Sequence, residues 1–238
     1  MANYDIVLDT ETAPTVKHND NNAHPETSLV YDFGWLVRNT KTGEIVERHS
    51  YIISETFFNS DLMNSAYYAN KLPQYRSGMG TLWQVKSFRD ALKAFQACIK
   101  AYKVKTVWAF NARFDRDVLN NTVRTYSNGY QRFAIPYKVE VKDIWARCAN
   151  ITGTAKYVKW AYSNGFVSES GNPKTSAEVV YRYLTDSTDF VESHTALADS
   201  EIEAFILTAA QKCKKRARKG IGNGWRNAAS TAKRLGLK

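Results

Sequence analysis

The chain has few of the residues that mark secreted or disulfide-bonded proteins. Only 3 of its 238 residues are cysteine, and none of them stands in a spacing typical of a metal or redox motif. An odd and scattered set of cysteines argues against a disulfide framework. We therefore expect Cys98, Cys148 and Cys213 to be reduced thiols that serve the structure.

Long hydrophobic runs are absent as well. No segment approaches the length that is needed to cross a bilayer, and the first residues show no basic region followed by an apolar stretch. These absences predict a cytoplasmic protein with no membrane partner. The chain is 44% hydrophobic, which is enough to bury one substantial core, so a single globular domain is expected.

Acidic residues are missing from the end of the chain. Residues 211–238 contain ten Lys and Arg and no acid, whereas the rest of the chain is balanced at 23 of each sign. We predict a domain over residues 1–210 and a basic tail over residues 211–238, with a glycine-rich link and a further short helix. The tail is either an arm that attracts nucleic acid or a solubilising segment.

Carboxylates are present where a strand is predicted to end. Residues 3–9 have the pattern of a short buried strand, and Asp9 and Glu11 follow at its end. Side chains two residues apart leave a strand on the same side, roughly 7 Å from one another. Asp9 and Glu11 can therefore bind one cation together.

Two further aspartates begin the buried faces of predicted helices. Asp115 lies three residues before Val118 in a helix expected over residues 114–124, after a strand over residues 105–110. Asp199 lies three residues before Ile202. The stripe that follows Asp199 consists of Ile202, Phe205, Ile206 and Ala209, and it excludes Glu201 and Glu203, which we expect to be solvated. A buried charge is costly unless it is compensated, so cations are the expected partners of both aspartates.

His194 precedes Asp199 by five residues, a spacing that would turn the two side chains apart on one helix. We therefore place His194 in the loop before the helix. Histidine has an intrinsic pKa of about 6.5, which suits a general base at neutral pH. Each motif alone has a simpler explanation, such as a solvated strand end or a helix N-terminus. Four carboxylates and a histidine in this order instead favour hydrolysis of phosphodiesters with two metal ions.

The order Asp-x-Glu, Asn-x-x-Phe-Asp and His-x-x-x-x-Asp resembles the DEDDh branch of the DEDD 3′–5′ exonuclease superfamily, over about residues 4 to 210. The segment from residue 174 to residue 206 is also similar to small exonucleases encoded by bacteriophages and their hosts, which implies a bacterial or phage-infected cytoplasm. The resemblance implies an α/β, ribonuclease H-like fold with a central mixed five-stranded sheet flanked by helices.

The remaining patterns agree with such a fold. Strand patterns are found at residues 3–9, 32–37, 45–54, 105–110 and 139–144, and the second and third are joined by a turn-rich linker. Ser87 begins a predicted helix that crosses back to the next strand, which would make that strand parallel. A second capping box, at residues 175–178, predicts a helix through Leu184.

The resemblance also implies roles for single residues. Two Mg²⁺ or Mn²⁺ ions would bind the carboxylates, with Asp9, Glu11 and Asp199 holding the first ion. Asp9 would also reach the second ion, which Asp115 would support through water, and His194 would deprotonate the attacking water. Contacts to the terminal nucleotide are carried over to Thr12, Asn111 and Phe114. Many relatives continue with Thr-Gly after the Asp-x-Glu, where this chain has Thr12-Ala13-Pro14.

The function predicted from this set is hydrolysis of 3′-terminal phosphodiesters, with release of nucleoside monophosphates. The expected substrate is a single-stranded or frayed 3′ end of DNA. An exoribonuclease that processes RNA ends or short oligomers is one alternative, and a non-catalytic nucleic-acid-binding or inhibitory module is another. The sequence leaves a polymerase or other protein partner open.

Two polar regions have competing interpretations. Residues 16–27 contain His18 and His24, which would need further ligands to bind a metal. Residues 156–173 alternate lysines with aromatics. These aromatics either stack on the bases of a single strand or face the core from a helix, and we favour the core.

Overall fold

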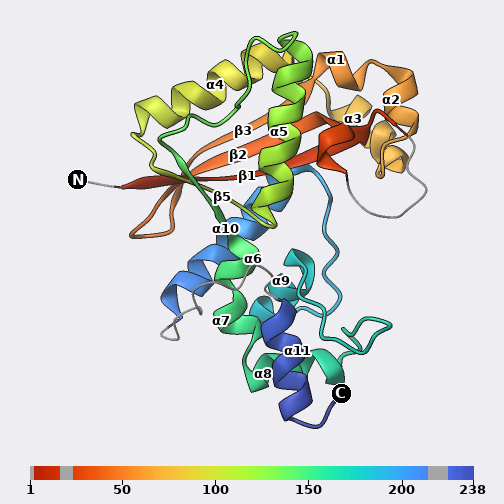
Figure 1. The fold of residues 1–238 in the computed structure, drawn as a ribbon, viewed down its shortest axis with the longest axis vertical. Helices are drawn as coiled ribbons and strands as arrows, with labels where there is room; N and C mark the ends of the chain where they lie inside the picture. Colours follow the sequence, from red (N-terminus) through yellow and green to blue (C-terminus); the bar gives the residue numbers. More distant parts are fainter. Residues whose placement is uncertain (1–2, 17–23, 214–224) are drawn as a thin grey trace. The chain divides into compact units, whose positions relative to one another are not determined.

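The computed structural model describes residues 3–16, 24–213 and 225–238 (Figure 1). The chain divides into two compact units, of which the first comprises residues 1–142 with 193–200 and the second residues 143–192 with 201–238. The domain boundary expected after residue 210 stays a prediction. Across the described ranges, every helix is too short or too polar to cross a membrane.

The first unit is built on a mixed six-stranded sheet with the strand order β4-β3-β2-β1-β5-β6. The strands are β1 (Tyr4–Pro14), β2 (Ser28–Asn39), β3 (Ile45–Ile53), β4 (Gln84–Lys86), β5 (Thr106–Ala109) and β6 (Glu140–Asp143). The expected mixed sheet is confirmed, but it has one strand more than the five predicted. The additional strand is β4, a three-residue edge strand whose short polar sequence carries no strand pattern.

Strands β1, β2 and β3 form an antiparallel meander, and the predicted crossover follows it. β1 pairs antiparallel with β2, and β2 antiparallel with β3. β5 lies parallel to β1, because the chain returns through α4 (Phe88–Ala101) before it enters β5. The predicted cap of α4 is present, since the Ser87 side chain accepts a hydrogen bond from the backbone N–H of Asp90 at 3.1 Å.

Helices α4 and α5 (Ala112–Tyr126) lie across one face of the sheet (Figure 1). Their apolar sides join alternate residues of the central strands, including Leu8, Phe33 and Trp35, in one buried cluster. A second buried cluster lies around the short helices α1 (Ser54–Phe57), α2 (Ser60–Asn64), η2 (Ala69–Lys71) and α3 (Leu72–Gly78). The short helix η1 (Pro25–Thr27), which precedes β2, is not part of this cluster. Tyr75 is fully buried in this second cluster.

The second unit is helical. Its helices are α6 (Ile144–Arg147), α7 (Ala149–Thr152), α8 (Ala155–Ser163), α9 (Ala177–Thr185), residues 201–212 of α10 (Ala196–Lys212), and α11 (Trp225–Arg234). The further helix expected in the basic tail is therefore present as α11. Ala228 and Ala232 of α11 pack on Val158 of α8, and the Thr231 hydroxyl donates to the Gly153 carbonyl at 2.9 Å. The tail thus contributes to the core of this unit.

Some helix details differ from the sequence pattern. Phe205 is 45% exposed, whereas Glu203 is 3% exposed, so the prediction of a buried Phe205 and a solvated Glu203 is wrong. The exposed side of α10 is formed by Glu201, Phe205 and Lys212, and most other positions of the helix are buried. A helix buried over most of its circumference carries little periodicity, so its pattern gave the wrong face. Ser176 precedes α9 as expected, but its side chain makes no capping hydrogen bond.

Candidate functional site

Strand β1 carries Asp9 and Glu11 within its length, because pairing with β2 continues to Pro14. The expectation that both residues follow the strand end is therefore wrong, although alternation still puts them on one face. Opposite them on β2 stand Gly34, which faces Asp9, and Asp32, which faces Glu11. The register shifts immediately after Glu11, so the ladder is irregular at this pair before it continues to Pro14.

Gly34 allows the first turn of α10 to rest directly on the sheet. A Cβ atom at this position would lie 2.2 Å from the backbone nitrogen of Leu197. The Ala196 backbone N–H donates to Oδ2 of Asp32 at 3.0 Å, which fixes the same turn beside Glu11. Asp199 belongs to this turn. Because Gly34 has no side chain, Asp199 of α10 can approach Glu11 of β1.

Asp115 reaches the site from α5, whose N-cap Asn111 adopts a left-handed conformation at φ 61°. The Asp115 side chain is buried at 3% exposure, as its place before the apolar stripe predicts. Its Oδ1 accepts a hydrogen bond from the Thr10 hydroxyl at 2.8 Å. Thr10 leaves β1 on the face opposite to Asp9 and Glu11, so Asp115 approaches the strand from the α5 side.

His194 lies in the loop before α10, as expected, with a left-handed backbone at φ 52°. Its ring stacks on that of Tyr68, with centroids 4.3 Å apart and planes inclined by 14°. Lys71 donates a hydrogen bond from Nζ to the carbonyl of the preceding residue, Ser193. The segment around η2 therefore holds the histidine loop in place. Sequence patterns gave no signal for Tyr68 or Lys71, because both belong to a short irregular connection.

Three of the predicted residues meet closely. One ligand atom from each of Glu11, His194 and Asp199 lies within 4.8 Å of the others, and His194 Nδ1 is 3.8 Å from Asp199 Oδ2. Asp9 and Asp115 are not members of this close group. Asp9 is two residues from Glu11 on the same face of β1, and the charge of Asp115 acts on Glu11.

The electrostatics of Glu11 reflect this crowding. Burial, followed by the negative charges of Asp199, Asp32 and Asp115, raises the pKa of Glu11 to about 10, while Lys71 opposes the shift. A carboxyl in this setting keeps its proton at neutral pH unless positive charge is supplied. A divalent cation would supply that charge.

Asp32 is a member of the site that the sequence patterns missed. It is fully buried, and Tyr75 donates a hydrogen bond to its Oδ2 at 2.7 Å. Its Oδ1 is buried without a hydrogen-bond partner in the described part of the chain. Burial raises the pKa of Asp32 to about 6, although the hydrogen bonds from Tyr75 and Ala196 oppose this. The sequence offered one signal for Asp32, which is an acidic residue within the apolar run of β2. Its place opposite Glu11 follows only when the register of β1 and β2 is known.

The donor set fits hard divalent cations. Mg²⁺ and Mn²⁺ prefer carboxylate oxygens, and several lie together here without enough positive charge in the protein to balance them. Glu11 and Asp199 would hold such an ion, with Asp9 beside them on the same strand face and His194 at its edge. The unpartnered Oδ1 of Asp32 adds negative potential behind Glu11.

A cavity of about 440 Å³ opens beside α5. Its lining includes Asn111 and Phe114, two of the three residues expected to contact a terminal nucleotide, whereas Thr12 is not part of it. The remaining lining residues are Pro25, Glu26, Arg113, Asp117, Asn120 and Arg124. Two arginines and a half-buried aromatic ring are suited to a phosphate and a base, respectively.

The two polar regions have different outcomes. His18 lies outside the described residues, and His24 pairs with Glu26 at 3.3 Å, so the metal-binding interpretation stays untested. In the region of residues 156–173, Tyr157 is fully buried and Trp160 stacks on Phe166 at 5.1 Å. Tyr157 therefore faces the core, as the favoured interpretation expects, whereas Trp160, Tyr162 and Phe166 are half-buried.

No protein-family model and no curated protein matches the sequence. Among solved structures, the chain is similar to E. coli exonuclease I in complex with a 5cy-dA13 oligonucleotide, with a TM-score of 0.59 and 14% identity over 89% of this chain and 41% of that chain. The zinc-bound complex of the E. coli protein with single-stranded DNA has a TM-score of 0.58 and 16% identity, over 90% of this chain and 42% of that chain. Exonuclease I in the apo form has a TM-score of 0.59 and 15% identity, over 90% of this chain and 43% of that chain.

The chain thus spans less than half the length of these structures. At this low identity the similarity shows the fold, which is ribonuclease H-like, as the sequence resemblance implied. Sequence identity gives no residue-level support, so the roles of the site residues rest on the geometry of this chain.

Proposed function

We propose that this chain is a metal-dependent 3′–5′ exonuclease that acts on single-stranded or frayed DNA ends, as the DEDDh resemblance implies. The observation that carries the proposal is the meeting of Glu11, His194 and Asp199 in a fold similar to that of exonuclease I. Asp9 lies on the same strand as Glu11, and Asp115 lies on α5. The E. coli protein is solved with DNA oligonucleotides, which supports DNA as the first substrate to test.

Two Mg²⁺ or Mn²⁺ ions, when bound, would polarise the scissile phosphate and stabilise the leaving 3′ oxygen. Asp9, Glu11, Asp115 and Asp199 are the residues that would hold them. His194 then accepts the proton of the attacking water on its imidazole. The Asp199 carboxylate, 3.8 Å from Nδ1, stabilises the imidazolium that results. Stacking on Tyr68 limits the rotation of the ring, so the base is oriented before the substrate arrives.

The cavity beside α5 supports a binding place for the strand end. Phe114 would stack on the terminal base and Asn111 would bind its polar edge, whereas Arg113 and Arg124 would attract a phosphate. This arrangement favours a single strand, because a paired base cannot stack on Phe114 until the duplex frays.

Digestion of 5′-labelled single-stranded DNA and RNA oligonucleotides with Mg²⁺ or Mn²⁺ tests the proposal. We expect a ladder that shortens from the 3′ end of DNA, and no ladder in EDTA or with Asp199→Asn. His194→Ala should lower the rate by about 100-fold or more, the range of a lost general base. Asp61→Asn, which changes an exposed carboxyl of α2, is the matched control and should digest normally.

Faster digestion of RNA than of DNA would replace the substrate with RNA and keep the reaction. Salt-sensitive binding of both oligonucleotides without any cleavage, under each metal, would contradict the exonuclease and support a non-catalytic binding module.

A further inference from the structure

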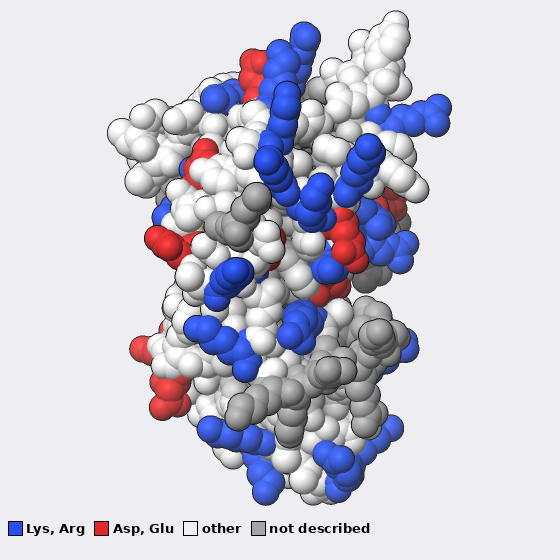
Figure 2. Space-filling view, turned by 90° about the vertical axis from the view of Figure 1, so that its left-hand side faces the viewer, with Lys and Arg blue, Asp and Glu red and all other residues white. Residues whose placement is uncertain are grey.

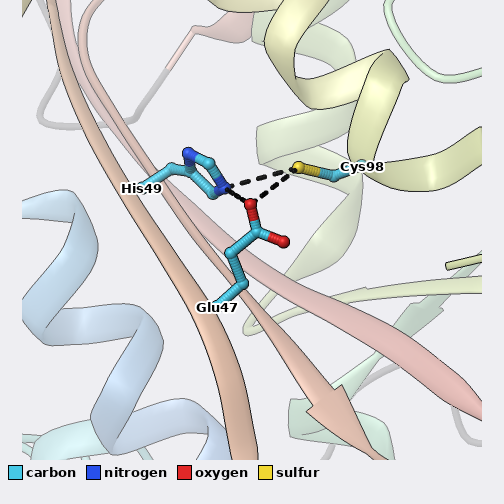
Figure 3. A group of neighbouring side chains, drawn as sticks. All are labelled: Glu47, His49 and Cys98. Carbon is cyan, nitrogen blue, oxygen red and sulfur yellow. Dashed lines mark hydrogen bonds and ion pairs between the residues drawn. The ribbon is translucent and has the colours of Figure 1, made fainter. Parts of the chain in front are cut away.

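A second group of metal-ligating side chains lies away from the carboxylate site, between strand β3 and helix α4 (Figure 3). Glu47 and His49 leave β3 on the same face, and Cys98 faces them from α4. His49 Nε2 is 2.8 Å from Glu47 Oε1 and 3.4 Å from Cys98 Sγ, which is itself 3.9 Å from the same carboxylate oxygen. We propose that Glu47, His49 and Cys98 bind a borderline-soft divalent metal ion of the Zn²⁺ type.

The spacing of the three atoms suits a tetrahedral ion. With usual zinc bond lengths, two ligand atoms that share an ion at the tetrahedral angle stand about 3.4 to 3.6 Å apart. The sulfur–nitrogen distance of 3.4 Å already agrees, and the sulfur–oxygen distance of 3.9 Å is slightly long. The nitrogen–oxygen distance of 2.8 Å is that of a hydrogen bond, and it must open by about 0.6 Å when an ion replaces the shared proton.

The histidine is supported in the manner of a metal ligand. Its ring stacks on Trp35 at 4.6 Å with an inclination of 18°, which fixes the plane of the imidazole. Nδ1 lies 3.2 Å from the Tyr51 hydroxyl, so it has its own partner while Nε2 points to Glu47 and Cys98. A hydrogen bond to the second ring nitrogen orients histidine ligands and sets their tautomer.

Ligand type and access favour zinc over magnesium. Thiolate and imidazole are preferred by zinc and related ions, whereas the carboxylate site offers hard oxygens. The side chains of His49 and Glu47 are 17% and 34% exposed, so an ion can enter from solvent and keep one position for water. Binding would release the proton of the Cys98 thiol and leave a sulfur–metal bond.

The sequence pattern did not predict this group, because its members come from two elements, β3 and α4. Glu47 and His49 are two residues apart on a strand, and Cys98 follows much later on a helix, so no Cys-rich spacing exists. An ion here would join β3 to α4, which both pack in the core of the first unit.

Titration of the full-length protein with Co²⁺, a spectroscopic substitute for Zn²⁺, tests the proposal. We expect an ultraviolet thiolate-to-cobalt charge-transfer band that saturates and is abolished by Zn²⁺. Oxygen ligands cannot produce this band, so the carboxylate site does not interfere. Cys98→Ala should remove the band and His49→Gln should weaken Co²⁺ binding at least tenfold. Tyr51→Phe, which removes only the support of Nδ1, should weaken binding by about tenfold.

Cys213→Ala and Cys148→Ala are the matched controls and should keep the band of the original protein. Circular dichroism confirms that each variant is folded before titration. Absence of the band in the original reduced protein at saturating Co²⁺, or its survival in folded Cys98→Ala, would overturn the proposal. The test does not involve nuclease activity, so its outcome is independent of the proposed function.

Discussion

At the scale of single residues, the protonation of Glu11 links stability to the proposed binding of metal. Its pKa is raised from 4.5 to about 10 by burial and by neighbouring carboxylates, and that of Asp32 is raised from 3.8 to about 6. A carboxyl whose pKa is higher in the folded state binds more protons folded than unfolded. Its contribution is therefore fully present below pH 4.5 and is lost as pH rises toward 10.

We predict that the metal-free protein loses stability as pH rises from about 5 to about 9, by at most about 1.4 kcal/mol per pH unit for Glu11. Glu11→Gln should flatten this dependence, because the amide does not titrate. Urea denaturation in EDTA at several pH values measures the free energy of unfolding. Equal slopes for the original protein and Glu11→Gln would show that Glu11 ionises normally.

Added Mg²⁺ should oppose the loss of stability at high pH. Because the ion replaces the proton on Glu11, the rise in Tm on adding Mg²⁺ should grow with pH in the original protein. Glu11→Gln removes a ligand and should reduce the rise at every pH. A Mg²⁺-induced shift that is independent of pH would argue against Glu11 as a ligand.

At the scale of secondary-structure elements, the approach of α10 to β2 depends on Gly34. We predict that Gly34→Ala lowers the free energy of unfolding by about 1–3 kcal/mol, the usual cost of overpacking. The added methyl group would push the first turn of α10 away, because it would lie 2.2 Å from the Leu197 nitrogen. Asp199 would move with this turn, so the rate of the proposed exonuclease reaction should fall more than stability alone explains, at a temperature where the variant is folded.

Ser50→Ala provides the control for Gly34→Ala. Ser50 is paired with Gly34 on β3, and its Oγ is buried without a hydrogen-bond partner among the residues that the structure describes. Removing this hydroxyl should leave stability unchanged or raise it slightly. If Gly34→Ala were as active and as stable as Ser50→Ala, the close contact with α10 would not position the site.

The elements differ in how well their sequences predict them. β2, β3 and α4 have clear alternation or capping, and their existence and pairing follow from local residues. β4 forms only because β3 offers it an edge, and Asp32 joins the site only because the hairpin register puts it opposite Glu11. Tyr68 meets His194 across more than a hundred residues. Such contacts depend on tertiary packing, and local periodicity does not contain them.

At the scale of the whole molecule, charge is distributed unevenly. On the face drawn in Figure 2, Lys and Arg side chains are more frequent than acidic ones. The basic segment before α11 lies partly at residues 214–224, outside the described residues, while α11 itself packs on α8. Truncation after residue 211 would therefore also expose apolar surface, so charge has to be tested by substitution.

We predict that replacing Lys214, Lys215 and Arg216 with glutamine makes binding of single-stranded DNA less dependent on salt. Each lost phosphate contact reduces the slope of log K against log salt by about 0.7, so the change is at most about 2. Fluorescence anisotropy at several salt concentrations, with EDTA to prevent cleavage, measures the slope.

A triple variant of the body gives the control. Lys41, Lys93 and Lys100 are exposed and carry the same total charge. Their replacement with glutamine changes net charge equally without touching the tail. Equal effects of the two triple variants would mean that overall charge, rather than an arm, determines the salt dependence.

The discontinuous first unit has a consequence for biosynthesis. Its sheet is complete by residue 143, yet His194 and Asp199 belong to a segment translated some fifty residues later. A ribosome-bound chain can fold the sheet as it emerges, since folding generally proceeds from the N-terminal side during synthesis. The nascent protein would thus display Asp9, Glu11 and Asp115 without their histidine. If the proposed nuclease is assembled in this order, it would stay inactive on nearby nucleic acid until residues 193–200 have been synthesised.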